Sequence, residues 1–245
     1  MRRFAAARDG GVAPGATTTP SILGRVARSS GQRLLAHDRR LGVRFVAGAD
    51  EAGRGSLAGP LVVAGVLLDY ETLRGARVRP LAGLNDSKQV APDDREALFH
   101  AVAGCASGIS VRIVSVHEID RSGLHRSNLA GLRAVLADLH PPAEACLVDG
   151  FRLGPEAPEH VAIVDGDTKS AAIAAASIVA KVVRDRLMHR MDALYPGYGF
   201  ASHVGYITPG HSAIVRERGP TGIHRRSFDA RCYEREPAEY ELARS

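Results

Sequence analysis

The chain is 245 residues long, with 45% hydrophobic and 24% charged residues, and its formal net charge is +5. This length and composition suit a globular protein with one main domain. No apolar run of about 18 residues could form a transmembrane helix, and the N-terminus lacks the apolar stretch of a secretory signal. The three cysteines, Cys105, Cys146 and Cys232, are scattered without CxxC spacing, which argues against a disulfide framework or a zinc site. We therefore expect a cytoplasmic protein with reduced thiols and no membrane partner.

Residues 1–28 are rich in Gly, Ala, Thr, Pro and Arg and show no sustained hydrophobic period, which is typical of a disordered tail. The tail is basic, because residues 1–44 contain nine arginines and only two aspartates. Such an arm could bind nucleic acid or could be a solvated tail, and the charge leaves both interpretations open. The folded part is expected to begin at residues 29–40, SSGQRLLAHDRR, whose pattern predicts a short capped helix.

Two strands are predicted on either side of a glycine-rich turn. RFVAGAD (44–50) and LVVAGVLLDY (61–70) are apolar runs of strand length, separated by EAGRGSLAGP. The turn glycines do not follow GxGxxG spacing, and Pro60 leads into a strand and not a helix, which argues against a dinucleotide site. We interpret the glycines as letting the backbone come close to a ligand, with Arg54 adding a cation.

The rest of the chain alternates helices and strands. Helices are expected at residues 91–104, 127–139 and 170–194, and strands at 109–116, 145–150 and 160–167. Ser170 can cap the Ala-rich last helix, and the last strand is expected to end near Asp165 and Asp167. From Tyr195 we expect loops with one short helix around 211–218. Together these elements predict an α/β fold with a mixed sheet flanked by helices.

Acidic residues follow the ends of three predicted strands: Asp50 with Glu51, then Asp149, then Asp167. Strand ends gathered at one edge of a sheet would bring four carboxylates together, although any one of them alone could equally be a solvated loop residue. Divalent cations relieve the repulsion in such a cluster, and hard oxygen ligands suit Mg²⁺ or Mn²⁺. Two such ions support phosphodiester hydrolysis. Because successive strand residues face opposite sides, we expect the chain to break near Gly53 and turn Glu51 back toward Asp50.

Several motifs resemble those of bacterial ribonuclease HII, the type 2 ribonuclease H. They are GADEAGRGSLAGP, LNDSK, LVDG, GDTKSAAIAAASIVAKVVRDRLM, YPGYGFASHVGYITPGH and GIHRRSF. They follow one another in that family's order over about residues 43–230. The resemblance implies a ribonuclease H-like mixed sheet with a small helical C-terminal part, and Mg²⁺ or Mn²⁺ as cofactor. It divides the chain into a tail at 1–28, a catalytic domain at 29–230 with a substrate-binding segment from about 195, and a tail at 231–245.

The activity implied by the resemblance is hydrolysis of RNA in RNA/DNA hybrids by a two-metal-ion mechanism. It also includes incision of duplex DNA on the 5′ side of a single embedded ribonucleotide, as in ribonucleotide excision repair, leaving a 3′-hydroxyl and a 5′-phosphate. The expected partners are therefore RNA/DNA hybrids and ribonucleotide-containing duplex DNA, bound by a monomer.

The resemblance also implies residue roles. The metal-binding catalytic acids are Asp50, Glu51, Asp149 and Asp167, and Asp165 has no counterpart. The turn Gly53, Arg54 and Gly55 reads the ribose 2′-hydroxyl, the group that distinguishes RNA from DNA. Tyr206 stacks on the sugar of the following deoxynucleotide. Basic residues near the substrate backbone are Lys88, Lys169, Lys181 and Arg184.

Other basic side chains near the C-terminus receive more ordinary interpretations. Arg225 and Arg226 could also contact the substrate backbone, although arginine pairs near a C-terminus more often form surface ion pairs. His203, His211 and His224 could act as acid or base groups, but a structural role is favoured for each, because two-metal chemistry needs no histidine.

The chain departs from the family pattern at Ser56, Gln89 and Val204, and Val204 removes a cation beside Tyr206. Two alternatives remain. A ribonuclease HIII-type enzyme would carry an extra N-terminal domain, for which the leader is too short and irregular. A non-catalytic nucleic-acid-binding module would use the basic arm and would have no need to keep all four acids.

Overall fold

The structure is a computed structural model that describes residues 29–233, built around a five-stranded sheet with the strand order β3-β2-β1-β4-β5. The strands are β1 Phe45–Ala52, β2 Leu61–Asp69, β3 Gly108–Val114, β4 Ala145–Asp149 and β5 His160–Ile163. β1 pairs antiparallel with β2 and parallel with β4, so the predicted mixed sheet is confirmed.

The register of the parallel pair brings two of the predicted acids together. Ala49 on β1 is paired with Val148 on β4, and the next residue on each strand is an aspartate, Asp50 or Asp149. The carboxyl ends of neighbouring parallel strands meet at the same edge of a sheet, so these two side chains leave that edge together.

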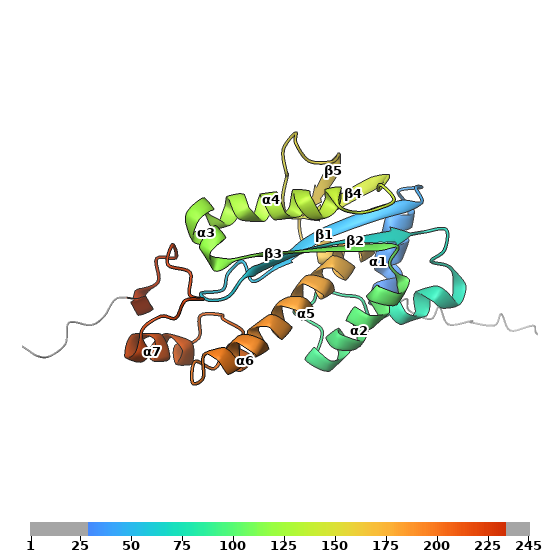
Figure 1. Ribbon diagram of the computed structural model, residues 1–245. Coiled ribbons are helices and arrows are strands. Elements are labelled where there is room, and N and C mark those ends of the chain that lie inside the picture. The colour runs from blue at the N-terminus through green and yellow to red at the C-terminus, as the bar shows by residue number, and fades with distance from the viewer. Residues whose placement is uncertain (1–28, 234–245) are drawn as a thin grey trace, which may run out of the picture.

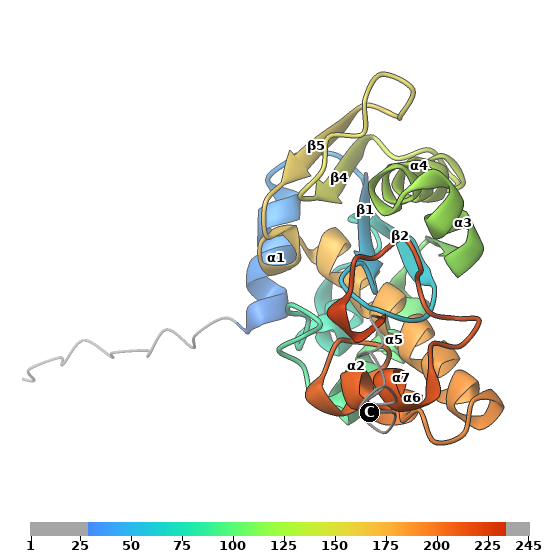
Figure 2. The same ribbon diagram turned by 90° about the vertical axis from the view of Figure 1, so that its left-hand side faces the viewer.

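Helices cover both faces of the sheet, as Figure 1 shows. They are α1 Ser30–Arg39, α2 Pro92–Cys105, α3 Val116–Ser122, α4 Leu124–Ala137 and α5 Ala171–Leu194. Helix α5 lies on one face together with α1 and α2, and α4 with α3 lies on the other (Figures 1 and 2). Each face of the sheet has its own hydrophobic core. No helix within residues 29–233 is both long enough and apolar enough to cross a membrane.

Helix α5 packs directly against β1. It begins after Ser170, whose hydroxyl accepts the backbone N–H of Ile173, as the predicted cap requires. Its first turns are small and buried from Ala171 to Ala176, and a side-chain carbon on Gly48 of β1 would collide with the Ala172 backbone. Because Gly48 faces Ala172, helix α5 packs in close contact with the strand that carries Asp50.

The C-terminal part is helical, as predicted, but has more elements than expected. Helix α7 Pro209–Arg218 corresponds to the predicted helix, while α6 Phe200–His203 and the 3₁₀ helix η3 Arg231–Tyr233 were not predicted. Cys232 in η3 is buried, so the folded part runs past the expected boundary at residue 230. The predicted tail at residues 1–28, and residues 234–245 of the predicted C-terminal tail, lie outside the described residues.

The last strand ends earlier than expected. β5 stops at Ile163, and Asp165 then adopts a left-handed conformation with φ 51°. This turn leads into the 3₁₀ helix η2 Gly166–Thr168, so Asp167 lies on a short helix before α5 and not at the strand end. Asparagine and aspartate tolerate this backbone region better than most residues, which explains why the chain turns here.

Candidate active site

Asp50 and Glu51 extend from opposite faces of β1. The chain does turn at Gly53, with φ 89°, but the strand continues through Ala52, so the turn comes after Glu51 and does not bring it back toward the Asp50 side. Asp50 therefore faces α5, near Ser177, whereas Glu51 faces α4, near Asn128. The Asp50 carboxylate accepts the Glu51 backbone N–H at 2.7 Å, which fixes its orientation.

The other two predicted acids are joined through η2. Asp149 at the end of β4 accepts the backbone N–H of Gly166 at 2.7 Å. Asp167, the next residue, is buried. This hydrogen bond thus joins the turn that carries Asp167 to the strand end that carries Asp149.

The four carboxylates share one electrostatic environment. Burial, and then the charges of Glu51 and Asp149, raise the pKa of Asp50 well above its ordinary value. Burial also raises the pKa of Glu51 to about 7, that of Asp167 to about 6, and that of Asp149. Asp149 lies in electrostatic range of each of the other three acids, so residues from three separate segments act on one another.

The donor set fits a hard divalent cation. Glu51 Oε2 is buried without a hydrogen-bond partner, and the amide atoms of the neighbouring Asn128 are also unpartnered. An unsatisfied carboxylate oxygen among other carboxylates is the environment that Mg²⁺ or Mn²⁺ stabilises. Within residues 29–233, however, no three acidic, histidine or cysteine side chains already stand close enough to form a complete metal site. Binding would therefore draw the carboxylates further together.

Lys88 is the predicted lysine that the fold brings to the acids. Burial lowers its pKa, but Asp86, Asp167 and Asp50 outweigh this effect, and the pKa is raised. Asp86 was missed by the sequence analysis, although it lies in the LNDSK motif that drew attention to Lys88. Its carboxylate raises the pKa of Asp167 after burial, and it accepts the Lys88 backbone N–H at 2.9 Å. The motif therefore contributes both a cation and a fifth carboxylate.

The other two lysines lie in different surroundings. Lys181 Nζ pairs with Asp185 at 2.7 Å and lies 5.6 Å from the centre of the Tyr206 ring. Lys169 Nζ is exposed and donates to the Val164 carbonyl at 2.6 Å. Lys181 is thus placed beside Tyr206, whereas the contact of Lys169 is local.

The Gly53–Gly55 turn is tightly packed at Gly53 and open at Gly55. A side-chain carbon on Gly53 would collide with Arg184, whereas the same carbon on Gly55 would meet nothing within 4 Å. Arg54 is exposed, and its guanidinium lies 4.6 Å from the centre of the Phe151 ring. The turn is thus anchored at Gly53 and accessible at Gly55.

Two buried arginines hold this turn. Arg184 is fully buried and donates to the carbonyls of Pro60, Val204 and Ala58. Its guanidinium is used within the protein, so the expectation that it lies along the substrate backbone is wrong. Its contacts join the turn to the segment that carries Tyr206.

Arg225 is also fully buried, and the expectation that it forms a surface ion pair is wrong. It donates twice to Gly59 O and once to Arg54 O. Its neighbour Arg226 is exposed and donates to the Pro220 carbonyl at 3.2 Å. Among residues 29–233, neither Arg184 nor Arg225 forms an ion pair with a carboxylate. The burial of these two arginines could not be predicted from the sequence, because it depends on tertiary packing and not on residue type.

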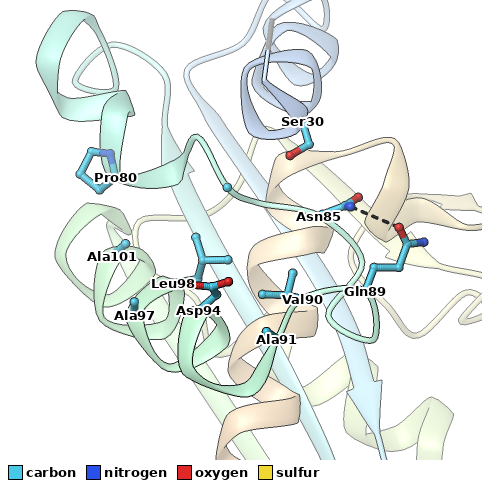
Figure 3. A pocket seen from close by; sticks show the side chains of 11 residues that line it. Ser30, Pro80, Asn85, Gln89, Val90, Ala91, Asp94, Ala97, Leu98 and Ala101 are labelled. Atoms are coloured by element: carbon cyan, nitrogen blue, oxygen red, sulfur yellow. Dashed lines mark hydrogen bonds between the residues drawn. The ribbon is translucent and has the colours of Figure 1, made fainter.

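A cavity of about 690 Å³ lies between α2 and the loop that carries LNDSK, and none of the four predicted acids lines it (Figure 3). Asn85 and Gln89, which line it, are hydrogen bonded to each other. Asp94 is the one carboxylate in its lining, so the cavity lacks a convergent set of reactive groups. The acid cluster is therefore the candidate active site.

Comparison with known proteins assigns the chain to a family. Residues 47–231 match the family model described as Ribonuclease HII. The chain is 44% identical over 207 residues to a ribonuclease HII of Geobacillus thermodenitrificans, covering 83% of this chain and 77% of that protein. It is 47% identical over 190 residues to a ribonuclease HII of Salinispora tropica, covering 78% and 68%.

Solved structures share the fold. The ribonuclease H2 of Pyrococcus horikoshii OT3 superposes with a TM-score of 0.64 at 28% identity, covering 76% of this chain and 94% of that one. The ribonuclease HII of Archaeoglobus fulgidus, solved in a complex with PCNA, gives the same score and identity, covering 76% and 96%. A Bst-RNase HIII in complex with Mn²⁺ has a TM-score of 0.55 at 22% identity, covering 75% and 65%, which is a likeness of fold alone.

Proposed function

The chain belongs to the ribonuclease HII family, whose members are endonucleases that cut the RNA of RNA/DNA hybrids, and we propose that it also incises duplex DNA 5′ of a single embedded ribonucleotide. The products would carry a 3′-hydroxyl and a 5′-phosphate, the first step of ribonucleotide excision repair. Residues 29–233 would form the catalytic unit, with the segment from about residue 195 binding substrate.

The acid cluster is the observation that carries this proposal. Asp50, Glu51, Asp149 and Asp167 would hold Mg²⁺ or Mn²⁺, as supported by their mutual effect on pKa and by the unpartnered oxygen of Glu51. When bound, a pair of such ions activates an attacking water and stabilises the leaving oxygen. Bst-RNase HIII, which shares this fold, was solved in complex with Mn²⁺. Asp149, which interacts with all three other acids, would orient the set.

The cations around the acids would position the substrate. Lys88 lies among the carboxylates and would meet the phosphate next to the cleaved bond, where it offsets the repulsion between carboxylates and phosphate. Lys181 would contact the backbone near Tyr206. These contacts fix the register of a duplex without reading its sequence.

The Gly53–Gly55 turn would recognise the ribonucleotide. Gly55 leaves space for a sugar to approach the main chain, and the buried anchors of the turn keep its N–H and C=O groups in place. A 2′-hydroxyl is both donor and acceptor, so a fixed main chain can distinguish ribose from deoxyribose. Tyr206, which the turn touches through Gly205, would stack on the next sugar.

The direct test is nicking of a labelled DNA duplex that contains one ribonucleotide. With Mg²⁺ or Mn²⁺, the wild type should cut at the 5′ phosphodiester of that ribonucleotide, and Asp50→Asn and Asp149→Asn should each lose at least about 100-fold in rate. Asp165→Asn is the matched control, because Asp165 is an exposed turn residue whose left-handed backbone suits asparagine. Equal cutting of an all-DNA duplex, or full activity of Asp149→Asn, would refute the proposed site.

A further inference from the structure

Three histidines gather in the C-terminal part, outside the acid cluster. His211 and His224 are 0% and 1% exposed. His203 stacks on His211 with ring centroids 4.0 Å apart and 16° between the ring planes. The two-metal chemistry uses none of them, so their buried polar nitrogens need another explanation.

Their hydrogen bonds specify which nitrogen carries each proton. His224 Nδ1 accepts the backbone N–H of Thr221 at 2.9 Å, so the proton of a neutral His224 is on Nε2. That Nε2 lies 3.0 Å from His211 Nε2, which must then accept. The remaining proton of His211 is on Nδ1, which donates to the carbonyl of Tyr206 at 2.8 Å. The bonds therefore run in one direction, from Thr221 through both rings to Tyr206.

Burial keeps the pair neutral, as this chain of bonds requires. It lowers the pKa of His211, and it lowers the pKa of His224 to about 4, with His211 adding to the effect. A second proton on His224 would face the Thr221 N–H, and the bond would be lost. The arrangement is thus a fixed structural linkage near neutral pH.

Both backbone polar groups of Tyr206 are hydrogen bonded to histidines. Its N–H donates to the carbonyl of His203 at 2.9 Å, while its own carbonyl accepts from His211. The N–H of Gly205 donates to His203 Nδ1 at 3.1 Å. The stacked rings of His203 and His211 therefore fix the main chain immediately before and after the Tyr206 side chain.

The same segments contact the glycine-rich turn. Ala58 pairs with His224 in an isolated β-bridge, and its N–H donates to the Gly205 carbonyl at 3.2 Å. A side-chain carbon on Gly205 would collide with the Ala58 carbonyl, so the two segments are in direct contact. The histidines thus lie where the Tyr206 segment meets the turn.

We propose that His211 and His224 are positioning residues that hold the Tyr206 main chain against the Gly53–Gly55 turn and thereby set discrimination at the ribonucleotide–deoxynucleotide junction. This inference rests on the proposed role of Tyr206. Both rings are buried, so they would act on the substrate indirectly: His211 through the Tyr206 carbonyl, and His224 through His211. A substrate whose next sugar is deoxyribose depends on that alignment, whereas a continuous RNA strand depends on it less.

The experiment compares rates on two substrates, a DNA duplex with one ribonucleotide and a long RNA/DNA hybrid. His211→Phe keeps a ring of similar shape and loses both hydrogen bonds. We expect it to lower kcat/KM on the single-ribonucleotide duplex about tenfold relative to the hybrid. His211→Asn should recover part of this ratio, because its amide nitrogen can replace Nδ1 as donor to Tyr206. A general loss of folded protein would lower both rates equally and leave the ratio unchanged.

A double-mutant cycle with Tyr206→Ala separates the possible outcomes. In that background, His211→Phe should not change the ratio further, because the residue through which it acts is gone. If Tyr206→Ala lowers the ratio and His211→Phe does not, the positioning role is overturned while the proposed function stands. If Tyr206→Ala leaves the ratio unchanged, the role of Tyr206 fails, and the inference fails with it. Should His211→Phe not fold, His224→Met removes the donor to His211 and must lower the same ratio.

Discussion

Glu51 is the acid whose environment is least satisfied. One of its oxygens is buried without a partner, and the amide of Asn128 beside it is also unpartnered. It belongs to β1 and faces α4, while Asp50 faces α5, so under the proposed function the two carboxylates would reach a shared ion from different faces of one strand. Consecutive acids on a straight strand can thus belong to one site when the strand ends beside them, at Gly53.

Glu51 makes the metal-free protein less stable as pH rises. Burial raises its pKa from 4.5 to about 7, so between these values the native state keeps a proton that the unfolded chain has lost. The stabilising contribution is full below pH 4.5 and disappears as pH rises to about 7. Glu51→Gln removes this titration and should reduce the loss of unfolding free energy across that range by about 3 kcal/mol. Urea unfolding in EDTA at several pH values measures it.

The exposed Glu159→Gln provides the control for this experiment, because it also replaces a glutamate by its amide. The unfolding free energy of Glu159→Gln should fall with rising pH as much as that of the wild type. Added Mg²⁺ should stabilise the wild type most at the higher pH values, where the carboxylates are ionised. Parallel pH profiles for wild type and Glu51→Gln would contradict the assignment of a buried, repelled carboxylate at this position.

At the scale of elements, two arginine side chains donate the hydrogen bonds that the backbone carbonyls of the glycine-rich turn do not receive from a neighbouring strand. Residues 53–60 connect β1 and β2 without a tight hairpin, so several of their carbonyls have no strand partner. Arg184 on α5 and Arg225 satisfy four of these groups, at Arg54, Ala58, Gly59 and Pro60. The planar guanidinium suits this task, because it offers donors in fixed directions to more than one acceptor.

Arg225→Met tests this role. Methionine fills part of the volume and donates nothing, so the Gly59 and Arg54 carbonyls would lose their three hydrogen bonds from this side chain. We expect a loss of about 2–4 kcal/mol in unfolding free energy, measured by urea denaturation. Arg226→Met is the matched control next in sequence; its guanidinium is exposed, and the change should cost less than about 1 kcal/mol. Equal effects of the two substitutions would show that burial of Arg225 adds nothing.

Some elements could be predicted from sequence because their signals are local. The apolar runs of β1 and β2, the small residues of α5 and its Ser170 cap are all visible within a few residues of the chain. The position of Asp167 was not, since it depends on a left-handed Asp165 that ends β5 early. The grouping of Asp86 with Asp167 and the burial of Arg184 and Arg225 depend on long-range packing, for which a single sequence has no periodic signal.

At the scale of the whole molecule, the site lies where the sheet meets the C-terminal part. Of the residues proposed for the site, the sheet carries Asp50, Glu51 and Asp149, and the C-terminal part carries Tyr206 and contacts that hold the turn. Arg184 links the two parts. It belongs to α5, which packs on the sheet, and it donates to the carbonyl of Val204, close to Tyr206 in the C-terminal part. The position of the Tyr206 segment relative to the sheet therefore depends on this buried arginine.

The charge balance of the assembled site leads to the last prediction. The acids face a polyanionic substrate, so without divalent ions they should oppose binding even as Lys88 attracts the phosphates. Asp167→Asn removes one negative charge and should tighten binding of a hybrid in EDTA about threefold to tenfold, while cleavage with Mg²⁺ is lost. Fluorescence anisotropy measures this, and the gain should shrink as salt screens the charges. Asp165→Asn, two residues away and exposed, should change affinity less. If Asp167→Asn weakened binding in EDTA, the carboxylate would contact the substrate directly as a hydrogen-bond acceptor and would not act by repulsion, because only the loss of an attractive contact outweighs the loss of a repelling charge.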